Sequence, residues 1–325
     1  MSWDLYWSDL LSKKKLKEKI DEMNLVDKQL DNSMTIEEIC HQIYNDYTNW
    51  NASLKEIKKD FLQEIDGIEG VHLQCSRIKT MDSLIVKVIT KRYENIRNKK
   101  SNYSRILGNN YKDIVTDLIG LRLIISYRGK WTTIHNGILE LFPFDAKSEY
   151  YSQMELLPHP INKNNIQVER PKVYYAKGDN VEQYKEYGLD VKIHKMGYRS
   201  IHYTVSFRGV YIEIQVRTIY DEAWSDCNHN YVYKHDENKS HTALVQISDI
   251  LCKLTNLSND IGEGMRNIYE KQSMLEIEGN RWETSKEVLD LFDVSLERMK
   301  DVYGDLNEFR QRLEFSEEVK EGGTQ

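Results

Sequence analysis

Several features are scarce or absent in this chain of 325 residues, and each absence excludes a class of protein. No apolar run approaches the roughly 18 residues that a membrane-spanning helix needs, so we expect no membrane partner. The four cysteines are widely spaced and form no C-x-x-C pair, which predicts neither a disulfide framework nor a zinc site. The net charge of −7 argues against a protein that coats nucleic acid non-specifically. The N-terminal segment places its apolar residues before its lysines, the reverse of a secretory signal, and we expect a cytoplasmic protein.

Proline is also scarce, and all four prolines fall in one interval, from Pro143 to Pro171, which is predicted to be a loop. Before it, the first hundred residues are predicted to be helical, with a capping box of Thr35 and Glu38. After it, alternation with a period of two predicts strands at 172–176, 189–195, 198–207 and 210–218.

A helical pattern returns near residue 219 and extends toward the C-terminus. There, apolar residues follow a near-heptad track that packs on the protein's own core, or forms a helical hairpin or an oligomer seam: Leu244, Ile247, Leu251, Leu254, Ile261, Met265 and Ile268. A homo-oligomer formed through the C-terminal helices is therefore one expectation.

Polar side chains gather on one side of three of the expected strands. Segment 210–218 places Glu213, Gln215 and Arg217 opposite a row of isoleucines and valines. Segment 198–207 does the same with Tyr198 and His202, and segment 189–195 with Lys192 and His194. If these strands are neighbours, their polar sides merge into one surface. The alternative is an ordinary solvated sheet face, but such faces usually carry Thr, Lys and Glu rather than Tyr, His, Gln and Arg together. The pattern favours a binding site.

A second feature is basic. Polar residues recur every fourth position at Lys79, Ser83, Lys87 and Lys91, with Arg77 just before them, which predicts a polar stripe on one helix face. Like charges in a row repel unless an anion lies between them, and a polyphosphate is a common partner; a solvated basic face is the alternative.

An acid, Asp117, leads into an apolar run that is predicted to be a buried strand, with Arg122 on its other side. Asp117 and Glu213 are hard oxygen ligands that could share Mg²⁺ bound to a phosphate. An Asp before a strand is also common as a cap or loop residue.

Five short motifs stand in order along residues 77–234. They are R-x-K-x-x-x-S-x-x-x-K (Arg77 to Lys87), D-L-x-G-x-R (Asp117 to Arg122), G-Y-R-S-x-H (Gly197 to His202), E-x-Q-x-R-T (Glu213 to Thr218) and A-W-x-x-x-x-H-x-x-x-Y-K (Ala223 to Lys234). Together they resemble the synthetase domain of RelA/SpoT homologues, and the small alarmone synthetase type in particular.

The resemblance implies an α+β fold, with a mixed sheet flanked by helices as in the nucleotidyltransferases. We expect helical N- and C-terminal extensions, with boundaries at 1–68, 69–237 and 238–325. The implied reaction is that of a pyrophosphokinase, which moves the β,γ-diphosphate of ATP onto the 3′-hydroxyl of GDP or GTP to give (p)ppGpp.

The resemblance also assigns roles to residues of this chain. Those that would bind the ATP phosphates are Arg77, Lys79, Ser83, Lys87 and Arg122. Asp117 and Glu213 would be catalytic and hold Mg²⁺, and Glu213 would also help to deprotonate the attacking hydroxyl. Tyr198 would stack on the acceptor base, in a pocket lined by His202, Gln215 and Arg217.

Two alternatives differ in their chemistry. A toxin-like relative would transfer the diphosphate to the 3′ end of tRNA, using the lysine-rich segments 13–19 and 91–100 as RNA contacts. A non-catalytic nucleotide-binding module is the third reading, against which the presence of both Asp117 and Glu213 argues. Acids within or beside the lysine-rich segments and the negative net charge favour GDP or GTP over tRNA.

Overall fold

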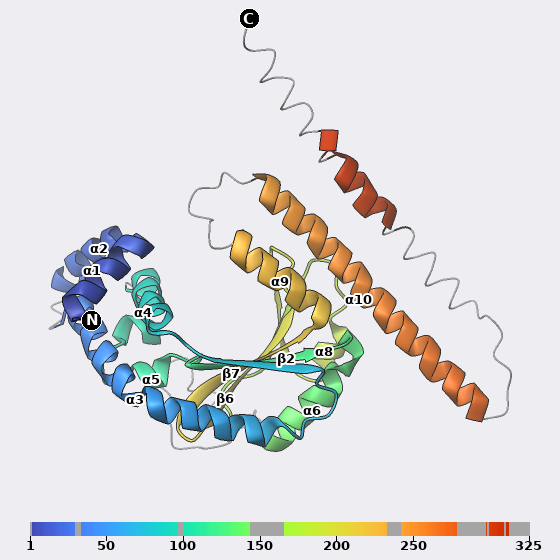
Figure 1. The fold of residues 1–325 in the computed structure, drawn as a ribbon, viewed down its shortest axis with the longest axis horizontal. Helices are drawn as coiled ribbons and strands as arrows, with labels where there is room; N and C mark the ends of the chain where they lie inside the picture. The colour runs from blue at the N-terminus through green and yellow to red at the C-terminus, as the bar shows by residue number, and fades with distance from the viewer. Residues whose placement is uncertain are drawn as a thin grey trace, which may run out of the picture.

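A mixed β-sheet forms the centre of the protein (Figure 1). The structure is a computed structural model and describes residues 2–29, 34–96, 101–143, 166–232, 242–277, 297, 299–308 and 310–311. In these residues the sheet has seven strands in the order β1-β2-β7-β6-β4-β5, with β3 paired to β6. The strands are β1 (Leu73–Ile78), β2 (Ile119–Ile125), β3 (Ile166–Gln167), β4 (Lys172–Tyr175), β5 (Asp190–Ile193), β6 (Ser200–Phe207) and β7 (Val210–Thr218).

Helices precede, interrupt and follow the strands. The α-helices are α1 (Trp3–Lys14), α2 (Lys17–Gln29), α3 (Ile36–Ile65), α4 (Met81–Asn95), α5 (Tyr111–Ile114), α6 (Trp131–Leu141), α8 (Glu182–Glu186), α9 (Ile219–Tyr231) and α10 (Thr242–Ile277). Two short 3₁₀ helices are η1 (Asn102–Arg105) and η2 (Arg128–Lys130). Pairs β2/β7 and β4/β5 are parallel and the other pairs are antiparallel, so the expected α+β fold with a mixed sheet is confirmed.

One face of the sheet is the hydrophobic core. Figure 1 shows α3 and α6 along this face, below the strands in that view. The Phe61 ring of α3 lies 5.3 Å from the Phe207 ring of β6, and His135 of α6 is 3.0 Å from the Tyr203 hydroxyl. The alternation of β2, β6 and β7 places their aliphatic side chains here, and Leu121, Ile214 and Tyr203 are almost fully buried.

The opposite face is polar, and strand register sets its rows. Gln215 of β7 is paired with Arg122 of β2 on one side and with His202 of β6 on the other. Glu213 is paired with Gly120 and Thr204 in the neighbouring row. Helix α9 lies over this face, between the sheet and α10 (Figure 1). The polar sides of the strands therefore merge into one surface, as the alternation predicts.

The structure differs from the sequence prediction in three local respects. Strand β1 lies within the first hundred residues, which were expected to be helical. Strand β4 lies between β5 and β6, because the short helix α8 returns the chain to pair β5 in parallel with β4. Helix α4 begins at Met81, where the Thr80 hydroxyl accepts a hydrogen bond from the Ser83 amide, so Lys79 precedes the helix instead of lying on it.

Other expectations for the helices and loops can be placed. The capping box at the start of α3 is confirmed, since Thr35 and Glu38 each bond the other's backbone amide. The predicted proline loop falls largely on residues 144–165, which lie outside the described residues, as does the end of the fifth motif at residues 233–234. The domain boundaries at 68/69 and 237/238 stay predictions. Within the described part of the chain, every helix is too short or too polar to cross a lipid bilayer.

Helix α10 does not use the expected apolar track for its packing. Its buried residues include Ile250, Cys252, Leu257 and Asn259. The track itself is largely exposed at Leu244, Ile247, Leu254 and Met265. The helix packs on α9 instead, through the Trp224 indole, which donates to the Ser248 carbonyl at 2.9 Å. An oligomer seam on the exposed side stays a prediction.

Candidate active site

Two lysines and one aspartate form a partly buried cluster at the edge of the polar face. The Lys79 ammonium lies 2.6 Å from one Asp117 oxygen, and the Lys87 ammonium lies 2.8 Å from the other. Asp117 stands two residues before β2, and the Lys79 amide donates to the Leu118 carbonyl at 2.9 Å, which fixes the loop before α4. The Tyr47 hydroxyl of α3 donates to the Lys79 carbonyl at 2.7 Å. A loop and a helix therefore converge on one carboxylate, and α3 holds the loop in place.

The pKa values in this cluster follow from burial and pairing. Burial would raise the pKa of Asp117, but the charges and hydrogen bonds of Lys87 and Lys79 outweigh it and hold that pKa below its ordinary value. Burial lowers the pKa of Lys79 by more than Asp117 restores. For Lys87, burial also acts to lower the pKa, but Tyr103 and Asp117 together raise it above the ordinary value. The Asp117 carboxylate is thus ionised and fully engaged by cations.

Glu213 is the second carboxylate of the site. Its Oε1 lies 3.3 Å from Nδ1 of His202, and its Oε2 accepts a hydrogen bond of 2.6 Å from Nε2 of Gln215. Burial would raise the pKa of Glu213, but the hydrogen bonds from His202 and Gln215 and the charge of Lys87 lower it to about 2. Lys87 thus contacts Asp117, and its charge also acts on Glu213.

Arg217 connects to Glu213 by two routes of hydrogen bonds. Its Nη2 donates to the Gln215 side-chain oxygen, and the Gln215 amide then donates to Glu213. The same nitrogen donates to the Tyr198 hydroxyl, which lies 2.9 Å from Nε2 of His202, and the other ring nitrogen of His202 faces Glu213. The guanidinium also lies over the Tyr198 ring, 4.8 Å from its centroid. The four acceptor-side residues expected from sequence thus form one closed ring with Glu213.

Arg77 and Arg122 lie beside this ring. They line a hollow of about 330 Å³ together with Glu213 and Gln215, and with Asp226 and His229 of α9 on its other wall. The Arg77 side chain lies over Gly120 of β2, 3.6 Å from where a Cβ would stand. Ser83 lies in the first turn of α4, one turn before Lys87, and its hydroxyl accepts a hydrogen bond from Thr80.

Three residues of the site were missed by sequence reasoning. Glu222 of α9 bridges two motifs: its Oε1 lies 2.7 Å from Arg122 and its Oε2 lies 2.9 Å from Arg217. Tyr103 of η1 has a hydrogen bond with Lys87, and Tyr174 of β4 lies 4.8 Å from the His202 ring and 5.8 Å from the Tyr198 ring. None of them belongs to a motif; the only signal was an acid in the first turns of the helix that follows β7.

The donor set suits Mg²⁺ bound to a nucleotide. Asp117 and Glu213 are oxygen ligands whose pKa values are both held below the ordinary value, so both are ionised. Among the described residues no three His, Cys, Asp or Glu side chains are placed to hold a metal ion by themselves. Mg²⁺ commonly binds through one or two carboxylates while substrate phosphates and water complete its octahedron. The two carboxylates fit that pattern.

Comparison with known proteins identifies the family. The family model described as "Region found in RelA / SpoT proteins" matches residues 76–238, which contain all five motifs. The chain belongs to the RelA/SpoT family. No curated protein sequence matches it significantly.

Solved structures similar to this RelA/SpoT protein include three bacterial proteins. Small alarmone synthetase 2 from Bacillus subtilis shares 19% identity over 70% of this chain and 98% of that one, with a TM-score of 0.37. Small alarmone synthetase 1 from Bacillus subtilis, bound to its product pppGpp, shares 15% identity over 70% of this chain and 95% of that one, with a TM-score of 0.36. A GTP pyrophosphokinase family protein from Streptococcus pneumoniae shares 16% identity over 73% of this chain and 96% of that one, with a TM-score of 0.36.

Proposed function

We propose that this protein is a pyrophosphokinase that transfers the β,γ-diphosphate of ATP to the 3′-hydroxyl of GDP or GTP, giving (p)ppGpp. The observation that carries the proposal is the pairing of Lys79 and Lys87 with Asp117, beside the polar face that holds Glu213 in the ring with Arg217. Membership of the RelA/SpoT family supports the same reaction class. In this reaction the 3′-oxygen bonds to the β-phosphorus, the bond from that phosphorus to the α,β-bridging oxygen breaks, and AMP leaves.

The lysine cluster is the donor side. Lys79 and Lys87 would exchange Asp117 for the ATP phosphates, with Ser83, Arg77 and Arg122 completing the phosphate contacts. Asp117 and Glu213 would then hold Mg²⁺, which supplies charge neutralisation on the transferring diphosphate when it is bound. Transfer of this group needs mainly positioning and electrostatic stabilisation, and both are properties of this cluster.

The pKa of Glu213 bears on its role. A carboxylate whose pKa is lowered to about 2 is a weak base at neutral pH, because its affinity for a proton is low. This supports the role of metal ligand for Glu213 over the role of a base that takes the proton of the 3′-hydroxyl. The proton would then leave to solvent or to a phosphate oxygen.

The ring of Tyr198, His202, Gln215 and Arg217 is the acceptor side. Tyr198 offers an aromatic surface for a base, and Tyr174 and His194 add aromatic walls 5.8 and 5.3 Å from its ring. Such a compact pocket suits a free nucleotide. The lysine-rich segments support tRNA less well, because Lys13 pairs with Asp9 and Lys91 pairs with Glu94, each at 2.7 Å.

A labelled-ATP assay tests the proposed function. The protein would be incubated with γ-labelled ATP and Mg²⁺, and separately with GDP, GTP or deacylated tRNA as acceptor. We expect label in guanosine tetra- or pentaphosphate and AMP as the second product. Label on tRNA alone would contradict the acceptor, and ATP left intact with every acceptor would contradict the reaction.

A further inference from the structure

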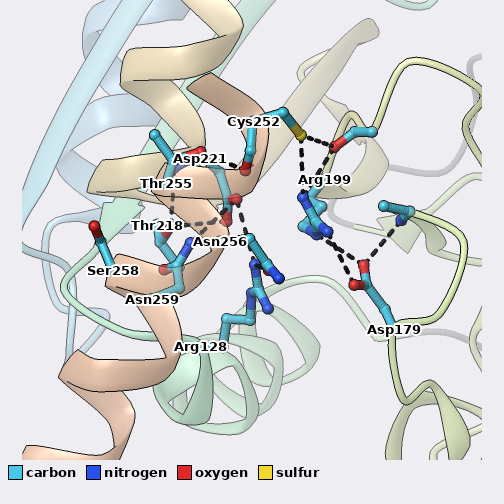
Figure 2. Close-up of polar contacts among 12 residues, drawn as sticks. Arg128, Asp179, Arg199, Thr218, Asp221, Cys252, Thr255, Asn256, Ser258 and Asn259 are labelled. Carbon is cyan, nitrogen blue, oxygen red and sulfur yellow. Dashed lines mark hydrogen bonds and ion pairs between the residues drawn. The ribbon is translucent and has the colours of Figure 1, made fainter. Parts of the chain in front are cut away.

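Helix α10 lies outside the family-matched residues 76–238, yet it contacts two segments of the acceptor side. Figure 2 shows these contacts, with Cys252 and Asn259 on α10 and Arg199, Thr218 and Asp221 on the segments that face it. The two contacts lie about two turns apart along the same helix. A single rigid element therefore spans both.

The first contact is with the segment that carries Tyr198. Arg199 Nη1 donates to the Cys252 sulfur at 3.5 Å, and the Cys252 thiol donates to the Gly197 carbonyl at 3.6 Å. Gly197 has a φ of +76°, and a Cβ there would lie 2.6 Å from that sulfur, so the helix and the segment approach more closely than any side chain would allow. Arg199 is held from its other side by a double ion pair with Asp179. Tyr198 is thus flanked on both sides by residues that α10 contacts.

The second contact is with the N-terminus of α9. Asn259, which is 1% exposed, donates through its amide to Asp221 at 3.2 Å. Asp221 accepts from the Thr218 hydroxyl at 2.7 Å, and its own amide donates back to that hydroxyl, which caps the helix. The next residue is Glu222, the carboxylate that bridges Arg122 and Arg217. The hydrogen bond from Asn259 of α10 therefore holds the residue next to Glu222, the carboxylate that pairs with Arg217.

A third set of contacts fixes α10 itself on η2. Arg128 donates to Asn256 at 2.8 Å and lies 3.7 Å from Asp260, and the Gly129 amide donates to Glu263 at 2.9 Å. Between α10, α8 and the end of the sheet lies a space of about 780 Å³. Each of its three arginines is paired with a carboxylate: Arg128 with Asp221 and Asp260, Arg199 with Asp179, and Arg217 with Glu222. The space therefore has the properties of a structural joint more than of an anion site.

The donor side is held by other elements. The contacts of Lys79, Lys87 and Asp117 come from Tyr47 of α3, from α4 and from Tyr103 of η1. We propose that α10 positions the acceptor side of the active site, with Cys252 and Asn259 as positioning residues, while the cluster of Lys79, Lys87 and Asp117 on the donor side forms without it. The inference rests on the proposed function only where it predicts a change in the KM of the acceptor.

Asn259→Asp is the sharpest variant, because it keeps the size of the side chain but replaces the amide donor with a carboxylate facing Asp221. We expect the KM for GDP or GTP to rise about tenfold, while the dissociation constant of a non-hydrolysable ATP analogue changes by less than about twofold. Ser258→Ala is the matched control, since the Ser258 hydroxyl bonds only the Leu254 carbonyl of its own helix, at 3.0 Å. It should change neither constant.

Cys252 provides a second, independent variant. Cys252→Leu adds bulk where a Cβ on Gly197 already finds no room, and it should raise the acceptor KM about tenfold with little effect on ATP binding. Cys252→Ser keeps the size and the hydrogen bonds, and it should restore the wild-type KM. Thermal unfolding of each variant shows whether it is folded.

Amide hydrogen exchange gives a readout that needs no turnover. In Asn259→Asp, exchange should become faster in segments 197–203 and 218–224 and stay unchanged in segment 79–87. Equal losses of ATP and acceptor binding, or faster exchange in all three segments, would overturn the inference. A wild-type protein that transfers no diphosphate would refute the proposed function alone, since the exchange pattern still decides whether α10 holds the acceptor segments.

Discussion

The donor side and the acceptor side of the candidate site are built from different interactions. On the donor side, Lys79 and Lys87 meet Asp117 through ion pairs, from a loop and a helix. On the acceptor side, side chains of adjacent strands form a hydrogen-bonded ring around Arg217. Long lysine side chains can exchange one anion for another, whereas a closed ring of hydrogen bonds holds one geometry. On the proposed function, the donor side would therefore select a ligand by charge and the acceptor side by shape.

The largest expected effect comes from Glu213, where the two sides meet. Glu213→Gln is nearly isosteric and removes one charge, and we expect turnover to fall by about 10² or more because a metal ligand is lost. The core face of β7 is untouched, so the fold should persist. Glu182→Gln, which changes an exposed carboxylate on α8, is the control. Wild-type turnover in Glu213→Gln would remove that residue from the site.

Lysine substitutions should affect the donor side alone. Lys87→Ala is expected to weaken ATP binding by roughly 1–3 kcal/mol, the loss of a charge-assisted phosphate contact, and to leave acceptor binding unchanged. Lys91→Ala is the matched control: it lies one turn further along α4, and its ammonium pairs with Glu94 at the surface. Titration calorimetry with a non-hydrolysable ATP analogue measures the difference. Equal losses for Lys87→Ala and Lys91→Ala would contradict the cluster as the phosphate site.

Tyr198→Ala should have the reverse selectivity. We expect the acceptor KM to rise about tenfold, since a stacking surface and a member of the ring are both removed, while ATP affinity stays nearly intact. Tyr269→Ala, an exposed tyrosine on α10, serves as the control. A loss of ATP affinity as large as the loss of acceptor affinity would show that the division between the two sides is wrong.

The smallest expected effect is a pH dependence of stability. The pKa of Glu213 is lowered from 4.5 to about 2, so the ionised carboxylate stabilises the folded state above the ordinary pKa, and this stabilisation is lost as the pH falls toward 2. The free energy of unfolding of wild type relative to Glu213→Gln should therefore decrease as the pH falls from about 5 to about 3. Urea unfolding at several pH values measures it. A constant difference would mean that Glu213 is not held ionised by its partners.

Much of the site could be predicted because it follows local patterns. The alternation in 210–218 places Glu213, Gln215 and Arg217 on one face, and strand geometry preserves that face in any sheet. The register of β6 against β7 then brings His202 beside Gln215. These residues form the ring that the structure shows.

Strand order and long-range partners could not be predicted. The insertion of β4 between β5 and β6 depends on how α8 packs, and alternation within a strand says nothing about its neighbours. Glu222 lies 100 residues from Arg122 in sequence, and Cys252 lies 53 residues from Arg199. Lys79 was placed on a helix because its four-residue spacing continues that of α4, but the Thr80 cap starts the helix after it. The lysine nevertheless reaches the same carboxylate from the loop.

The cluster of Lys79, Lys87 and Asp117 has a consequence for the order in which ligands arrive. Two ammonium groups surround the one carboxylate of Asp117 at this corner of the site, a local excess of positive charge that the ionised Glu213 partly offsets through Lys87. A bare divalent cation is repelled from such a corner, whereas a polyphosphate is attracted to it. Asp117 becomes available only when phosphate oxygens have taken over the lysines. On the proposed function, Asp117 would become a metal ligand only together with the nucleotide, so the nucleotide complex, and not free magnesium, would be the species that the resting site binds.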